Sequence, residues 1–227
     1  MKKYIGDTAK SYSQTRGKMG LLIPALKRLL PNATKGGAAL LDIACGIGDL
    51  STIALEKGYQ YFGLDISEDM IKRATQEYPS NNYIISSSTN FASKYKQKFD
   101  LVLISMLFTD LGNKEDIYKT LNECKKVLKK DGIIVIGTVH PSFDRYMQAG
   151  VLGRKGDKVE FKNYYSSGDK FYIQHAFNGK PYIFEDYHWT LTDYMDCIKK
   201  AGLSITDIDE CPPDEKTQGL DKDFFTS

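Results

Sequence analysis

A short glycine-containing stretch limits what this sequence can fold into more than any other feature does. Residues 40–43 form an apolar run that holds one acid, Asp42, and Gly46 and Gly48 follow shortly after it. An apolar run, two spaced glycines and then helical spacing predict a buried strand, a tight turn and a helix start. Such a turn presents free backbone N–H groups to a ligand, and glycine is needed where a Cβ would block the ligand's approach.

A second strand pattern follows at once and also ends in an acid. Residues 61–66 read Tyr-Phe-Gly-Leu-Asp-Ile, which places Asp65 at the tip of the expected strand. A carboxylate at that tip, about 20 residues after the first turn, can accept hydrogen bonds from both hydroxyls of a ribose. The two patterns together predict a unit that binds a nucleoside.

The acid inside the first strand separates the classes of cofactor that use such a unit. A dinucleotide-binding G-x-G-x-x-G pattern would need glycine at position 51, where this chain has Ser51. Asp42 would repel a pyrophosphate and would attract a cofactor that carries an ammonium group. A nicotinamide-dependent oxidoreductase and a catalytically silent nucleoside-binding module remain as alternatives, as does an ordinary strand–turn–helix without a nucleoside ligand.

The stretches L-D-I-A-C-G-I-G-D and G-L-D-I-S resemble the first two motifs of the class I S-adenosylmethionine-dependent methyltransferases. Ala44 stands where that family usually has glycine. The resemblance covers roughly residues 9–211 and implies methyl transfer from S-adenosyl-L-methionine to a small organic acceptor. It implies cofactor binding by Tyr12, Arg16, Asp42, Ala44, Gly46, Gly48, Asp65, Ile66, Met70, Ser87, Ser105 and Met106.

The resemblance also implies a role for several of these residues. Tyr12 and Arg16 would close over the cofactor, with the Arg16 guanidinium paired to its carboxylate. Met70 would contact the adenine, and Ser87 takes the place of an acid that binds the adenine amino group. Ser105 and Met106 would line the sulfonium. A solvated Arg16, simple core packing of Met70 and a core helix that begins at Met106 are the competing interpretations.

The rest of the chain alternates strand and helix patterns. Further strands are expected at 82–86, 99–105 and 133–139, and a sixth at 203–209. Helices are expected at 20–30, after the glycine turn up to Gly58, at 68–78, at 114–130 and from Thr190 to Gly202. In the first of these, Pro24 is tolerable if it lies in the first turn. This alternation predicts an α/β fold with a Rossmann-like, doubly wound and mostly parallel sheet.

We expect a single domain that carries two lids. Residues 1–37 would form an N-terminal helical lid, 38–140 the cofactor-binding core, 141–188 a substrate lid inserted after the fifth strand, and 189–227 the last helix and closing strands. The insertion is rich in aromatic residues, and Asn178-Gly179 between two strand patterns is a strong hairpin signal. An insertion after the carboxyl end of a strand would lie over the ligand crevice.

Methyl transfer from a sulfonium is an in-line displacement, and positioning can supply about 7–11 kcal/mol of its barrier. A base matters only if the acceptor arrives protonated. His140, directly after the fifth strand, is the first candidate for that base and His188 the second. For any single histidine a structural role is the commoner one, and no metal is expected.

Composition bears on partners and location. A net charge of +2 gives no basic field for nucleic acid, and the N/D-P-P-Y/F loop of many base methyltransferases is missing after Ser105. The four cysteines show no C-x-x-C spacing, which indicates reduced thiols, and neither a membrane span nor a signal peptide is recognisable. We therefore expect a cytoplasmic monomer or homodimer that acts on a small molecule, without nucleic-acid or membrane partners.

Overall fold

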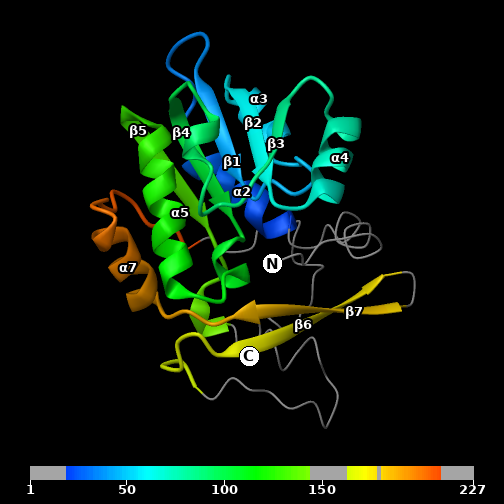
Figure 1. Cartoon of the computed structure of the whole chain (residues 1–227), viewed down its shortest axis with the longest axis vertical. Coiled ribbons are helices and arrows are strands. Elements are labelled where there is room, and N and C mark those ends of the chain that lie inside the picture. The colour runs from blue at the N-terminus through cyan, green and yellow to red at the C-terminus, as the bar shows by residue number, and fades with distance from the viewer. Residues whose placement is uncertain (1–18, 144–162, 178–179, 211–227) are drawn as a thin grey trace.

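A five-stranded parallel sheet forms the centre of the computed structural model, which describes residues 19–143, 163–177 and 180–210 (Figure 1). The strand order is β3-β2-β1-β4-β5. The strands are β1 (Ala39–Ile43), β2 (Gln60–Asp65), β3 (Asn82–Ile85), β4 (Phe99–Ser105) and β5 (Leu128–Gly137). The order reverses between β1 and β4, and open α/β sheets bind ligands beyond the carboxyl ends of strands at such a switch point. The predicted α/β, Rossmann-like fold is confirmed.

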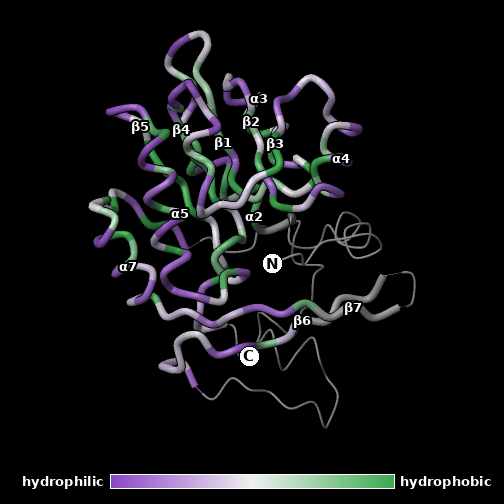
Figure 2. The backbone as a smooth tube through the Cα atoms, in the orientation of Figure 1, coloured by the Kyte–Doolittle hydropathy of each residue, from purple (hydrophilic) through white to green (hydrophobic). Residues whose placement is uncertain are grey.

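Helices cover both faces of this sheet. They are α2 (Met19–Leu29), α3 (Ser51–Glu56), α4 (Glu68–Glu77), α5 (Lys114–Val127) and α7 (Leu191–Lys200). One hydrophobic cluster lies between the sheet and helices α5 and α7, and it contains Leu41, Ile43 and Val102. A second cluster lies on the other face, between the sheet and helices α2 and α3, and it contains Leu40 and Leu101. Because both faces are buried, the central strands are almost continuously apolar (Figure 2).

Local capping explains where several helices begin. Ser67 accepts a hydrogen bond from the Met70 amide at the start of α4, and Asn113 does the same for the Glu115 amide at the start of α5. Thr190 forms a complete capping box with Asp193 at the start of α7. These side chains satisfy N–H groups that the first turn of a helix leaves without intrahelical partners. The predicted starts of α4 and α7 are confirmed.

The boundary between α5 and β5 differs from the prediction. The helical pattern was expected to continue to Lys130, but α5 ends at Val127 and β5 begins at Leu128. The Lys129 ammonium donates to Asp100 on β4 over 2.7 Å, which holds this segment against the neighbouring strand. Pairing with the sheet therefore overrides helical spacing over the last residues.

A further expectation was wrong. Residues 203–209 form no strand, and within them Ile205 and Ile208 are exposed. An alternating pattern becomes a strand only where a sheet edge pairs with it, and this segment lacks that pairing. Pro24 lies beyond the first turn of α2, where its ring removes a backbone hydrogen bond from the helix.

The predicted hairpin in the insertion is confirmed as a separate two-stranded sheet. Its strands β6 (Lys170–Phe177) and β7 (Lys180–Tyr187) are antiparallel, and Phe177 pairs with Lys180 across residues 178–179. The hairpin extends beyond the carboxyl edge of the main sheet, below it in Figure 1. Its base rests on the loop after β4, where the Trp189 indole donates to the Leu111 carbonyl over 3.0 Å.

None of the helices within the described ranges combines the length and the apolar character that a bilayer crossing requires. Tyr12 and Arg16, which were predicted to close over the cofactor, lie outside the described residues.

Candidate functional site

The predicted site residues come from segments that end at one edge of the sheet. Ala44, Gly46 and Gly48 follow β1, Asp65 ends β2, and Ile66 follows it. Ser87 follows β3, Ser105 ends β4 and Met106 follows it, and His140 lies after β5. Because all five strands are parallel, their carboxyl ends meet at the same edge. The topology therefore gathers residues that are scattered over nearly 100 positions of sequence.

The glycine turn after β1 is fastened to the tip of β2. The Gly46 amide donates to Asp65 Oδ2 over 3.0 Å. Gly46 and Gly48 both have positive φ, of 56° and 81°. A Cβ added to Gly46 would meet nothing within 4 Å, whereas one added to Gly48 would lie 2.6 Å from the Tyr83 hydroxyl. Gly46 thus leaves open space for a ligand, and Gly48 allows Tyr83 to pack beneath the turn.

Two residues other than glycine adopt the left-handed conformation in the described chain, and both follow central strands. Ala44 has φ of 60° after β1, and Met106 has φ of 56° after β4. An L-residue in this region costs roughly 1–2 kcal/mol relative to the right-handed conformation. Such strain gathers at functional sites, where the surrounding structure enforces it. The φ of Ala44 also explains why a glycine suits this position.

Asp65 is buried and bound by backbone on both sides. Its Oδ2 accepts the Gly46 amide, and its Oδ1 accepts the Ser67 amide over 2.8 Å. Burial raises the pKa of this carboxyl, and the backbone N–H donors of Ser67 and Gly46 oppose that effect. Each carboxylate oxygen keeps a second lone pair, so the group can also accept hydrogen bonds from two ligand hydroxyls.

Asp42 is completely buried beneath the same turn. The Tyr61 hydroxyl donates to its Oδ2 over 2.7 Å, and its Oδ1 has no hydrogen-bond partner in the described part of the chain. Burial raises its pKa to about 7; the Tyr61 hydroxyl lowers the pKa, and the charge of Asp65 adds to the increase. A buried carboxyl oxygen without a partner costs free energy unless a donor or cation reaches it.

The residues predicted at the adenine end differ in accessibility. Ile66, directly after Asp65, is 49% exposed, whereas Met70 in α4 is 1% exposed. Ser87 accepts the Thr89 amide over 3.3 Å and shares a hydrogen bond of 2.9 Å with the Thr89 hydroxyl. Ile66 therefore offers an open apolar surface beside Asp65, and Met70 packs in the interior.

Sequence reasoning missed Glu123, which holds the loop after β3. Its Oε2 accepts the amides of Phe91 and Ala92, each over 2.8 Å, although it lies on α5. Thr120, also on α5, donates to the Ser88 hydroxyl over 3.1 Å. The available signal was a glutamate beside the apolar face of a predicted helix, but its partners lie more than 30 residues earlier in the sequence.

The two histidines have different surroundings. The Ser142 amide donates to His140 Nδ1 over 3.3 Å, and His140 Nε2 lies 3.3 Å from a carboxylate oxygen of Glu210. His188 is fully buried, and its Nε2 lies 2.8 Å from the Tyr164 carbonyl oxygen. His188 thus stabilises the base of the insertion, while His140 keeps a partly exposed ring after β5.

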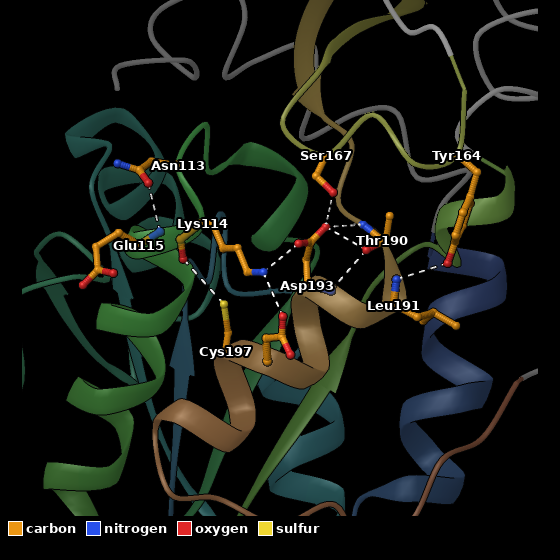
Figure 3. A network of polar contacts seen from close by, with 10 residues as sticks. Asn113, Lys114, Glu115, Tyr164, Ser167, Thr190, Leu191, Asp193 and Cys197 are labelled. Carbon is orange, nitrogen blue, oxygen red and sulfur yellow. Dashed lines mark hydrogen bonds and ion pairs between the residues drawn. The ribbon is translucent and has the colours of Figure 1, made fainter.

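A polar network ties the insertion to the core close to the start of α5 and α7 (Figure 3). Asp193 Oδ1 accepts the Lys114 ammonium over 2.7 Å, and its Oδ2 accepts the hydroxyls of Ser167 and Thr190 over 2.5 and 2.8 Å. Burial would raise the Asp193 pKa, but these donors outweigh it and lower the pKa to about 2. The carboxylate therefore joins three chain segments through charge-assisted hydrogen bonds.

The donor set suits S-adenosylmethionine better than it suits a pyrophosphate or a metal. The turn leaves open space at Gly46, Asp65 keeps lone pairs that can accept from hydroxyl groups, and Ile66 is an exposed apolar side chain beside it. The unpartnered oxygen of Asp42 favours positive charge near the turn. The described residues contain no group of three or more potential metal-ligating side chains.

Comparisons with known proteins place the chain among methyltransferases. Residues 41–136 match a family described as a methyltransferase domain. YqeM of Bacillus subtilis, named as a candidate methyltransferase, is 25% identical over 201 residues, covering 80% of this chain and 81% of that protein. A glycine/sarcosine N-methyltransferase of Parasynechococcus marenigrum is 30% identical over 126 residues, covering 53% of this chain and 44% of that protein. The structure of an S-adenosylmethionine-dependent methyltransferase from Clostridium acetobutylicum has the same fold, with a TM-score of 0.58 and 19% identity. The match covers 85% of this chain and 82% of that chain.

Replacing Ala44 by glycine should stabilise the protein. Glycine adopts a φ of 60° without the strain that alanine carries, although it loses more entropy on folding. We expect the free energy of unfolding to rise by about 0.5–1 kcal/mol and the melting temperature by about 1–4 °C. Ala74→Gly, inside α4, is the matched control and should destabilise by about 1 kcal/mol. A loss of stability in Ala44→Gly would show that the turn is unstrained.

Asp193 should make folding stability depend on acidity below about pH 4. Its pKa of about 2 lies below the usual 3.8, so its contribution is present above pH 4 and is lost as pH falls towards 2. In urea unfolding at pH 6, we expect the free energy of unfolding of the wild type to exceed that of Asp193→Asn by about 2 kcal/mol. This difference should be halved by about pH 3. Asp196→Asn removes the more exposed partner of Lys114 and should change stability by less than about 1 kcal/mol. An advantage that did not depend on pH would contradict the prediction.

Proposed function

Since this chain belongs to the class I S-adenosylmethionine-dependent methyltransferases, we propose that it transfers the methyl group to a small organic acceptor by in-line displacement. S-adenosylmethionine is the methyl donor. The observation that carries the proposal is the buried Asp65 carboxylate, fastened to the Gly46 amide next to open space. The nicotinamide alternative has no such support, because the chain lacks the third glycine and buries an acid beneath the turn.

Several described residues of the site have a proposed task at the cofactor. Asp65 would accept the ribose hydroxyls, and Ile66 would pack against the adenine. The Ser87 hydroxyl would accept from the adenine amino group, more weakly than a carboxylate does. Gly46 would let the backbone approach the methionine portion, whose ammonium Asp42 would stabilise through its charge. Tyr12 and Arg16 stay predictions for the outer wall.

The sulfonium supplies an activated methyl group, so the protein has to align the acceptor rather than activate the leaving group. Ser105 ends β4, the strand beside β1, and Met106 follows it; both are proposed to line the transfer path. The left-handed backbone of Met106 sets the direction of the chain at this point. Alignment of this kind supplies about 7–11 kcal/mol in well-oriented reactions, without an acid for the thioether.

His140 is the proposed base for an acceptor that arrives protonated. A proton taken from the acceptor at Nδ1 would displace the Ser142 amide, and Nε2 lies beside the Glu210 carboxylate. Both partners keep the imidazole oriented, as a general base requires. His188 is a weaker candidate, because its ring is fully buried and lies against a backbone carbonyl.

The acceptor is proposed to be a small molecule enclosed by the insertion. The support is the hairpin β6–β7 beyond the carboxyl edge, anchored through Trp189 and Asp193. The Parasynechococcus marenigrum relative is named for glycine and sarcosine, two small amino acids. We retain the proposed division into an N-terminal lid at 1–37, a core at 38–140, a substrate lid at 141–188 and a closing segment at 189–227.

A labelled methyl group tests the proposal directly. The full chain is incubated with S-adenosylmethionine carrying a ¹³C methyl group and with separate pools of small amines, carboxylic acids, phenols, quinones and thiols. We expect a new methyl resonance in at least one pool, and its chemical shift distinguishes O-, N-, C- and S-methylation. Transfer only to RNA, DNA or protein, or cofactor binding without any transfer, would contradict a small-molecule methyltransferase.

Asp65→Ala should abolish cofactor binding. The substitution removes the two charge-assisted hydrogen bonds that Asp65 is proposed to accept from the ribose hydroxyls, each of about 1.5–3 kcal/mol. The affinity for the cofactor should therefore fall by about 100-fold or more. Glu68→Ala is the control, because it deletes an exposed acid in the first turn of α4, three residues after Asp65 in the sequence. Isothermal titration with S-adenosylhomocysteine measures both. Unchanged affinity in Asp65→Ala would contradict the assignment of the ribose site.

A further inference from the structure

The buried pair of Tyr61 and Asp42 has a geometry that cofactor contact alone does not explain. Neither side chain has meaningful exposure, and the tyrosine hydroxyl donates to one carboxyl oxygen over 2.7 Å. The other oxygen, Asp42 Oδ1, is buried without a partner in the described residues. A carboxyl held this way is half-satisfied, and such a group responds strongly to charge brought near it.

Groups from the glycine turn, β2 and β3 face this carboxyl, and all of them are acidic or neutral. The turn contributes the Cys45 thiol, β2 contributes Tyr61 and Asp65, and β3 contributes Tyr83, which packs edge-to-face on Tyr61. No ion pair of Asp42 occurs in residues 19–143, 163–177 and 180–210. The described protein therefore provides no cation that would stabilise the ionised form.

Without a cation, the charged and the neutral form of Asp42 are close in free energy at neutral pH. Burial is the largest reason why the pKa rises to about 7, and the negative charge of Asp65 acts in the same direction. The hydroxyl of Tyr61 is the group that opposes them. A positive charge placed at the adjoining turn would add to the effect of Tyr61 and drive the carboxyl towards ionisation.

We propose that Tyr61 is a positioning residue that sets the ionisation of Asp42, so that binding of the cofactor's ammonium group at the glycine turn releases a proton from Asp42 to solvent. The O–H bond of the carboxylic acid breaks, the proton leaves to the buffer, and the carboxylate remains. No electrons are transferred. The inference requires the cofactor but is independent of the acceptor, so it can fail while the proposed function stands.

The release should appear as a pH-dependent affinity. Below about pH 7 the free protein holds the proton, and each unit of pH should change the affinity for S-adenosylhomocysteine by up to about tenfold. Above pH 8 the carboxyl is already ionised, and the affinity should be constant. S-adenosylhomocysteine keeps the ammonium group and is not consumed, which makes it the suitable probe.

Calorimetric titration of the full chain in two buffers with different ionisation enthalpies counts the protons released. We expect close to one proton per bound S-adenosylhomocysteine near pH 6, falling to none near pH 8.5. Asp42→Asn cannot ionise, so the difference between the two proteins isolates Asp42 from every other group, including the ligand's own amine. Equal proton release by wild type and Asp42→Asn would overturn the proposal.

The role of Tyr61 is tested by the pH at the midpoint of the curve of proton release against pH. Tyr61→Phe keeps the ring but removes the donor, so the pH at which half a proton is released should move upwards. Tyr95→Phe is the matched control, because it deletes another buried hydroxyl that does not contact Asp42. An unmoved curve in Tyr61→Phe would overturn the positioning role, because a purely packing role leaves proton release unchanged.

A second measurement keeps the proposal falsifiable if Tyr61→Phe does not fold. Carbon-13 resonances of the aspartate carboxyls in wild-type protein, assigned with Asp42→Asn, follow the ionisation of Asp42 directly. Addition of saturating S-adenosylhomocysteine at pH 6 should shift this resonance to the ionised position. A resonance that stays at the protonated position on binding would overturn the proposal.

Discussion

The hydrogen bond from the Gly46 amide to Asp65 joins the turn after β1 to the tip of β2, and the geometry of the site depends on it. The bond forms because two adjacent parallel strands end side by side, which brings the turn after β1 next to the tip of β2. The same carboxylate accepts the Ser67 amide and so holds the start of α4. One buried acid therefore sets the spacing between turn, strand tip and helix.

Burial on both faces of the sheet explains the electrostatics beneath that turn. The central strands are covered by helices on each side, so Asp42 has no exposed surface and little solvation. Tyr61 supplies one donor, and the remaining oxygen has no partner among the described residues. A carboxyl in such surroundings is sensitive to a cation at the adjoining turn, which is the kind of ligand that S-adenosylmethionine provides.

The insertion is held in place by side-chain hydrogen bonds to a charged carboxylate and by backbone hydrogen bonds. Asp193 links Lys114, Ser167 and Thr190, while the His188 amide donates to the Asp169 carbonyl over 2.9 Å. These contacts hold the base of the hairpin next to the loop after β4, on the side where the strands end. The hairpin is therefore attached at the same edge of the sheet as the residues that are proposed to hold the cofactor.

The sequence alone determined the α/β fold, the glycine turn, the acid at the tip of β2 and the hairpin, because each depends on local spacing that a linear chain displays. Only the tertiary structure decided which residues meet across long separations. Glu123 holds the loop after β3, Tyr61 donates to Asp42, and Lys129 draws β5 against β4. Residues 203–209 form no strand because no neighbouring strand edge among the described residues pairs with them, and the sequence alone does not show which edges are available.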